Sequence, residues 1–150
     1  GHRAGNHICN KHWGYLTMST QAQLRLAPKD YFVTRDGLTY AGSHFLIDHW
    51  EADGLDDPET VERALVAAAE VANATILHTH FHHFSEGGGV SGVGVLSESR
   101  ISIHTWPERG YAAVDIFMCG DAAPARAVPV LRAAFRPGRV AVSEQKRGRL

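Results

Sequence analysis

Residues Val90–Gly120, VSGVGVLSESRISIHTWPERGYAAVDIFMCG, contain three extended segments in close succession. The segments cover residues 90–97, 100–106 and 111–119, and each is rich in the β-branched, aromatic and apolar residues that favour strands. Only Glu98 and Ser99 separate the first two segments, and Pro107 and Gly110 interrupt the chain before the third. Because connections this short join antiparallel neighbours, the whole stretch is predicted to form a meander of strands.

Upstream of this meander, the sequence predicts two further strands with a helix between them. Residues 43–50 form a short apolar run with aromatic content, and residues 75–84 are again extended. Asp57 precedes Pro58, which is the order of an N-cap followed by proline at the first helical position. Apolar residues then recur at helical spacing, at Val61, Leu65, Ala68 and Ala72. We expect this helix to pack on the sheet.

Downstream, residues 123–135 are predicted to form a second helix, and Val140 and Val142 indicate a last strand. Pro129 lies inside the helical segment, so it must kink the helix or delay its start. The order strand, helix, several strands, helix, strand predicts an α+β fold. We expect a two-layer sandwich in which a largely antiparallel sheet carries two helices on one face.

Size and composition indicate one domain without a membrane or nucleic-acid partner. The 150 residues are 44% hydrophobic, and 15 basic against 16 acidic residues leave a formal net charge of -1. No apolar run approaches the length of a transmembrane helix, and the start lacks the order of a secretory signal, so we expect a cytoplasmic protein. Residues 1–41 are expected to be a partly mobile N-terminal extension, followed by a domain over residues 42–150.

The motif LSESRISIHTWPE, residues 96–108, followed eleven residues later by Cys119, indicates the chemistry. From Gly42 to Gly148 the chain resembles the small prokaryotic S-adenosylmethionine decarboxylases, which are self-processing and pyruvoyl-dependent. The resemblance implies that the chain is a proenzyme in which Ser99 becomes a pyruvoyl group that binds the substrate amine as a Schiff base. Cleavage between Glu98 and Ser99 would leave a β chain, residues 1–98, and an α chain, residues 99–150, folded together.

A pyruvoyl group would meet a chemical need of any amino-acid decarboxylase. Loss of carbon dioxide requires an electron sink, which no ordinary side chain supplies. The chain has only three lysines, Lys11, Lys29 and Lys146, and all lie in polar terminal stretches unlike a pyridoxal-phosphate site. The resemblance therefore implies a pyruvoyl cofactor made from Ser99, with neither pyridoxal phosphate nor a metal.

The resemblance also implies roles for five other residues. His104 would move protons during processing, and an imidazole with a pKa of about 6.5 suits that task. Ser91 would assist the ester step, and Cys119 would return a proton to the product carbanion. Glu108 and Phe84 would bind the ribose and the adenine of the substrate. Without the resemblance, each of these residues has an ordinary structural explanation, such as inert packing of a buried cysteine.

Histidines and glycines near the meander raise two further possibilities. His78, His80 and His82 alternate along a predicted strand, which places three imidazoles on one face as in a metal site. The resemblance implies no metal there. The run Gly87–Gly89 lacks the lysine and the following helix of a phosphate-binding loop. Asp48 is expected to line the substrate site.

Arg100 departs from the family pattern, in which histidine follows the processed serine. It brings a permanent cation next to the future cofactor, although S-adenosylmethionine is itself a sulfonium cation, so Arg100 either points outward or grips the carboxylate. Two alternatives stay open: a pyruvoyl-dependent arginine or ornithine decarboxylase, and an unprocessed regulatory homologue. On the favoured interpretation, the protein is a homodimer of processed protomers that acts in spermidine synthesis.

Overall fold

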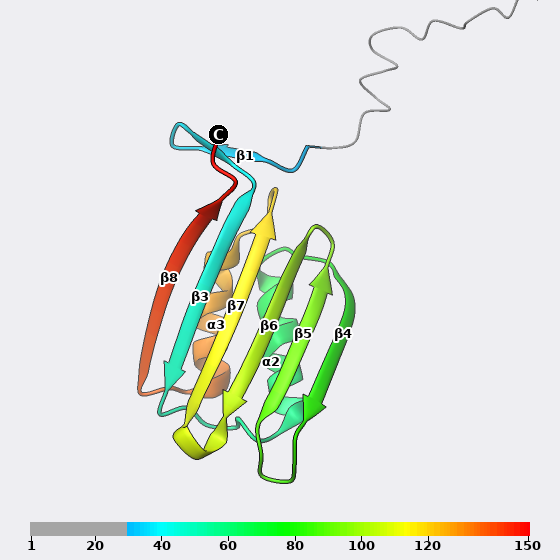
Figure 1. Cartoon of the computed structure of the whole chain (residues 1–150), viewed down its shortest axis with the longest axis vertical. Helices are drawn as coiled ribbons and strands as arrows, with labels where there is room; N and C mark the ends of the chain where they lie inside the picture. The colour runs from blue at the N-terminus through cyan, green and yellow to red at the C-terminus, as the bar shows by residue number, and fades with distance from the viewer. Residues whose placement is uncertain (1–29) are drawn as a thin grey trace, which may run out of the picture. The chain divides into compact units, whose positions relative to one another are not determined.

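A six-stranded antiparallel sheet runs through residues 30–150, the part of the chain that the computed structural model describes (Figure 1). Its strands lie in the order β4, β5, β6, β7, β3, β8. Their bounds are β3 Gly42–Trp50, β4 Ile76–His83, β5 Val90–Leu96, β6 Ser99–Trp106, β7 Tyr111–Cys119 and β8 Arg139–Arg147. The predicted meander is confirmed as β5, β6 and β7, and β4 extends it to one edge of the sheet.

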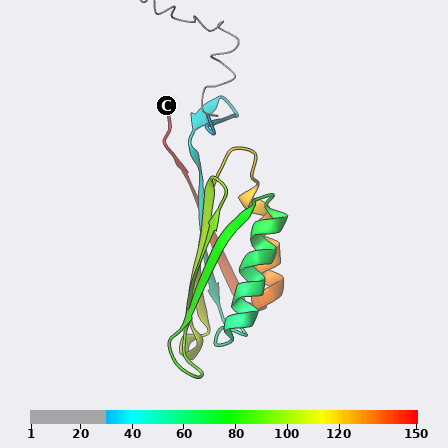
Figure 2. The same cartoon turned by 90° about the vertical axis from the view of Figure 1, so that its right-hand side faces the viewer.

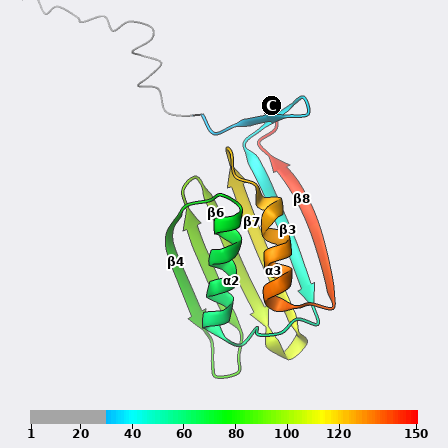
Figure 3. The same cartoon turned by 180° about the vertical axis from the view of Figure 1, so that it is seen from behind.

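Two helices, α2 (Pro58–Val71) and α3 (Ala127–Phe135), cover a single face of this sheet (Figures 2 and 3). They pack side by side, with α2 over β4, β5 and β6 and with α3 toward β3. The predicted two-layer α+β sandwich is therefore confirmed. Within residues 30–150, neither helix is long and apolar enough to cross a bilayer.

Local sequence features explain where each helix begins. Asp57 caps α2, because its carboxylate accepts a hydrogen bond from the backbone N–H of Glu59 at 3.1 Å. The 3₁₀ turn η2 (Pro124–Arg126) precedes α3, so regular helix begins only at Ala127. Pro129 consequently falls in the first turn, where its missing N–H removes no intrahelical hydrogen bond. The predicted delay of this helix is confirmed.

The core lies between the helices and the inward-facing residues of the sheet. Strand alternation points aliphatic side chains such as Ile47, Ile101 and Ile116 toward the helices, and each is at most 1% exposed. Thr105 is one of the buried polar residues of this layer. Its hydroxyl donates to the carbonyl of Leu55 at 2.6 Å and accepts from the N–H of Val90 at 2.8 Å, which joins the loop before α2 to the sheet.

The other face of the sheet carries no helix, and we refer to it as the open face (Figure 2). Alternation places here the side chains between the core positions of each strand, which are partly or fully exposed. On β6 they include Arg100, Ser102, His104 and Trp106. Polar, aromatic and charged groups of the central motif are thus gathered on one accessible surface.

A short hairpin precedes the sheet and was not predicted. Strands β1 (Val33–Arg35) and β2 (Leu38–Tyr40) pair through a turn at Asp36–Gly37, where both residues have positive φ angles of 51° and 76°. Asp-Gly is a strong hairpin signal, but three-residue strands are too short to show a hydrophobic period. Part of the segment expected to be an extension, residues 1–41, is therefore regular structure, and residues 1–29 with Cys9 lie outside the described residues.

His49 is an unusual member of the core. Its side chain is fully buried and lies edge-on against Phe135, with ring centroids 5.8 Å apart. Neither ring nitrogen has a hydrogen-bond partner. Burial lowers the pKa of His49, because the charged imidazolium would lose its hydration. The Ala112 backbone and nearby Asp48 oppose this shift, and Arg132 adds to it.

This buried imidazole predicts a loss of stability in mild acid. Below the unfolded pKa of about 6.5, the unfolded chain binds a proton that the folded chain excludes, so the free energy of unfolding should fall by about 1 kcal/mol from pH 7.5 to 5.5. Urea unfolding at the two pH values measures this. His49→Leu should remove most of the slope, whereas His78→Leu, at an exposed position, should keep it. An unchanged slope in His49→Leu would contradict the assignment.

Candidate active site

The predicted scission bond lies in a tight turn at one end of the sheet. Strand β5 ends at Leu96, strand β6 begins at Ser99, and only Ser97 and Glu98 join them. Glu98 has a φ of 65°, in the left-handed region that costs a residue with a side chain about 1 kcal/mol. The carbonyl that Ser99 would attack therefore belongs to a residue held in a strained conformation.

Cys119 lies beside this turn because β7 runs antiparallel to β6. Its backbone N–H donates a hydrogen bond to the Ser99 hydroxyl oxygen at 3.3 Å. Burial raises the pKa of the Cys119 thiol, the negative charge of Glu98 raises it further, and Arg100 opposes both effects. The thiol therefore keeps its proton at neutral pH, as a proton donor must.

Gly42 makes the space that Cys119 needs. It is the direct partner of Cys119 across β3 and β7. A Cβ atom at position 42 would lie 3.1 Å from Cys119 Sγ and 2.5 Å from the carbonyl oxygen of Met118. Any side chain at this position would displace the strand or the thiol.

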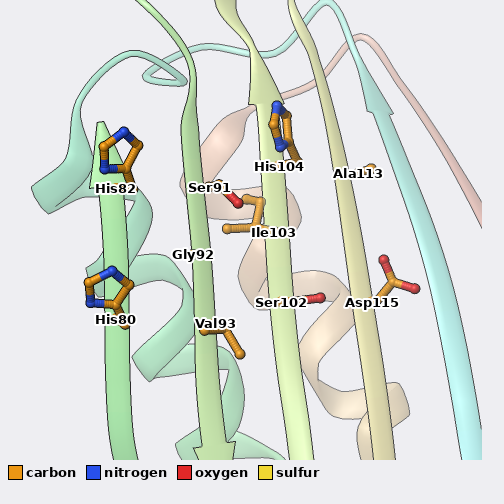
Figure 4. Close-up of a pocket in the computed structure, with 10 residues that line it drawn as sticks. All are labelled: His80, His82, Ser91, Gly92, Val93, Ser102, Ile103, His104, Ala113 and Asp115. Carbon is orange, nitrogen blue, oxygen red and sulfur yellow. The ribbon is translucent and has the colours of Figure 1, made fainter. Parts of the chain in front are cut away.

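A second group of predicted residues lies farther along the open face, where Ser91 and His104 are direct partners across β5 and β6. They line an open depression of about 320 Å³ together with His80, His82, Ser102 and Asp115 (Figure 4). Phe84 packs against His104 with ring centroids 5.6 Å apart. The Trp106 ring packs against the same imidazole, with ring centroids 4.2 Å apart.

The two groups are well separated within one chain. Ser99 and His104 are five residues apart on one strand, which corresponds to roughly 16 Å at about 3.3 Å per residue. Glu108 is farther still from Ser99, in the 3₁₀ turn η1 (Pro107–Arg109) that follows β6. One protomer therefore brings together Glu98, Ser99 and Cys119 at one end of the sheet. Ser91, His104, Phe84 and Glu108 lie toward the other end.

An aromatic cluster at that second end was missed from the sequence. Tyr111 lies between Trp106 and Trp50, with ring centroids 5.3 and 5.9 Å away, and its hydroxyl donates a hydrogen bond to Asp48. This hydrogen bond is the main cause that raises the pKa of Tyr111 to about 12. Arg139 covers the Trp50 ring at 3.8 Å. The sequence feature that could have indicated this cluster is the presence of large aromatic residues at several strand ends.

The sequence offers the alternating histidines of β4 as candidate metal ligands. His80 and His82 both face the depression, as the alternation predicted. Within residues 30–150, however, the structure contains no group of three or more histidine, cysteine or acidic side chains arranged to hold a metal ion. His82 instead packs edge-on against Phe84, with ring centroids 4.8 Å apart.

Comparison with known proteins identifies the family of this chain. Residues 43–148 match the family described as S-adenosylmethionine decarboxylase. A protein of Thermomicrobium roseum named S-adenosylmethionine decarboxylase proenzyme is 44% identical over 108 residues, which cover 71% of this chain and 93% of that protein. A protein of the same name from Acidithiobacillus ferrooxidans is 46% identical over 112 residues, covering 73% and 84%.

A solved structure supports the same assignment. The crystal structure of the adenosylmethionine decarboxylase from Aquifex aeolicus has a TM-score of 0.66 and 36% identity to this chain, and the match covers 73% of this chain and 92% of that one. The resemblance seen in residues 42–148 is thus confirmed at the level of sequence and of fold. This chain belongs to the S-adenosylmethionine decarboxylase family.

Proposed function

We propose that this chain is the proenzyme of a pyruvoyl-dependent decarboxylase that converts S-adenosylmethionine to its decarboxylated form for spermidine synthesis. The observation that carries the proposal is the turn at residues 97–98, in which a strained Glu98 precedes a serine hydroxyl that contacts the Cys119 backbone. The names of the relatives favour S-adenosylmethionine over arginine or ornithine as the substrate. They also favour a processed enzyme over an unprocessed regulatory homologue.

Processing would use the chain's own atoms. The Ser99 hydroxyl attacks the Glu98 carbonyl carbon and the Ser99 nitrogen leaves it, so an ester replaces the peptide bond. Loss of the Ser99 α-proton expels the Glu98 carboxylate and leaves a dehydroalanine at position 99. Water then displaces ammonia, which leaves a pyruvoyl group. Release of the strain at Glu98 would favour the first step.

The residues around the turn fit the chemistry of that group. Its carbonyl would supply the electron sink for loss of carbon dioxide from an α-amino acid. Cys119 would hold the proton that the product carbon needs, because burial and Glu98 keep its thiol protonated. Gly42 leaves room for that thiol beside position 99.

His104 and Ser91 would act in processing, although one chain keeps them far from Ser99. A proton transfer needs a separation of about 3 Å, not roughly 16 Å. If two protomers packed open face against open face about a two-fold axis, the Ser99 end of one protomer would lie beside the His104 end of its partner. We therefore propose that the active site is shared between two protomers.

The open face suits such a dimer. Its exposed apolar side chains include Leu46, Val93, Val95 and Trp106, which are 37% to 47% exposed in the single chain. A sheet face with this composition gains stability when a second sheet covers it. The same pairing would bring Phe84 and Glu108 of one protomer toward position 99 of the other, where they would bind the adenine and the ribose of the substrate.

The proposed cleavage predicts two fragments. Intact-mass spectrometry of the purified protein should show chains of residues 1–98 and 99–150, the second with a pyruvoyl group at its start. Ser99→Ala should give a single uncut chain with no release of carbon dioxide from S-adenosylmethionine, because no hydroxyl can attack Glu98. Full activity in Ser99→Ala, or an intact active wild type, would contradict the proposal.

The shared site predicts that two inactive variants can restore one another. Co-expressed Ser99→Ala and His104→Ala chains should form mixed dimers in which one site is native, so activity should return to about a quarter of the wild-type level. Each variant alone should be inactive.

A matched control uses two residues at the same end of the sheet. Ser99→Ala and Cys119→Ser both damage the group at position 99, so their mixture should show no activity beyond the sum of the two separate proteins. Restoration by this control pair, or its absence in the first pair with mixed dimers present, would contradict a site shared in this way.

A further inference from the structure

Two arginines converge on one aromatic ring beside Ser99 and Cys119. Arg100, on β6, is the direct partner of Phe117 on β7, and its guanidinium lies 4.7 Å from the centroid of that ring. Arg147, on β8, places its guanidinium 5.7 Å from the same centroid. Both separations are within the range of about 6 Å over which a cation is attracted to an aromatic face.

Gly42 allows this convergence. In strand β3, which lies between β7 and the edge strand β8, Gly42 is paired with Cys119 on one side and with Arg147 on the other. Because Gly42 has no side chain, the long side chain of Arg147 can reach over β3 toward Phe117. The same gap accommodates Cys119 Sγ, so the two guanidinium groups and the thiol occupy one corner of the open face.

Neither arginine forms an ion pair within the described residues. Across residues 30–150, the ion pairs are His44 with Asp115 and Arg136 with Asp53, and neither involves Arg100 or Arg147. Two cations held at one ring repel each other, and an anion between them would offset that repulsion. Guanidinium groups bind carboxylates through paired hydrogen bonds, so a carboxylate is the fitting anion.

We propose that Arg100 and Arg147, the arginine pair, bind the carboxylate of the substrate amino acid at position 99. This inference rests on the proposed function and specifies how the substrate is held. The carboxylate and the amine of an α-amino acid share one carbon, so an amine directed at residue 99 brings the carboxylate toward Cys119, whose backbone N–H contacts Ser99 Oγ. The arginine pair lies at the same end of the sheet, around Phe117. The positive charge of Arg100 next to the cofactor then has a partner in the substrate.

The chemistry of the reaction allows carboxylate binding by the arginine pair to be distinguished from a role in the chemical step. The carboxylate is lost as carbon dioxide, so its contacts stabilise the bound substrate more than the transition state. Removing the arginine pair should therefore raise KM without lowering kcat. The decarboxylated product lacks the carboxylate, so its affinity should not depend on the arginine pair.

The test compares Arg100→Gln and Arg147→Gln with Lys146→Gln in the cleaved enzyme. Lys146 is the residue before Arg147 and lies over Tyr40, so this control removes one charge from the same strand on its other face. We expect each arginine variant to raise KM for S-adenosylmethionine about tenfold, with kcat unchanged or higher. The Kd of the decarboxylated product, measured by calorimetry, should stay within about twofold of the wild type, and Lys146→Gln should change neither quantity.

Three results would overturn the inference: an unchanged KM, a fall in kcat alone, or an equal loss of affinity for substrate and product. Intact mass first establishes that each variant is cleaved. Arg100 lies next to the scission bond, so Arg100→Gln can also prevent cleavage. Arg147 is remote from that bond in sequence, so in that case Arg147→Gln alone tests whether the arginine pair binds the carboxylate. An inactive wild type would contradict the proposed function, whereas an active wild type with arginine variants of normal KM contradicts only the arginine pair.

Discussion

Only one face of the sheet is buried, and this constraint determines which side chains of the strands are available for chemistry. Strand alternation sends each second side chain toward α2 and α3, where most are apolar, and leaves the other set on the open face. Ile101 and Ile103 belong to the first set, and Arg100, Ser102 and His104 to the second. A single strand thus anchors the core and presents reactive side chains. Polar groups can be gathered on the open face without the cost of burying them.

The extended strand also separates the residues that it presents. A helix would bring positions 99 and 104 within one or two turns, but a strand holds them roughly 16 Å apart. The chemistry proposed above needs both near one substrate, and an antiparallel partner protomer would supply this arrangement. The exposed Val93, Val95 and Trp106 side chains are consistent with that need, because they lie on the surface that a partner would cover.

At the end of the sheet that carries Ser99, small backbone features have large chemical effects. The left-handed conformation of Glu98 places strain next to the bond predicted to break. The missing side chain of Gly42 accommodates Cys119 Sγ and lets Arg147 approach Phe117. Burial and Glu98 raise the pKa of Cys119 while Arg100 lowers it. The Cys119 thiol and the two guanidinium groups thus lie at one corner of the open face.

Local sequence patterns predicted most of the secondary-structure elements. Alternation and turn residues located the strands, Asp57 and Pro58 located the start of α2, and the motif around Ser99 identified the family. They missed the hairpin at 33–40, whose strands are too short for a period. They could not place Asp48 on Tyr111, or Arg147 above Phe117, because these contacts depend on β3 lying between β7 and β8. Strand order of that kind comes from packing between distant segments, so only the tertiary structure decides which side chains meet.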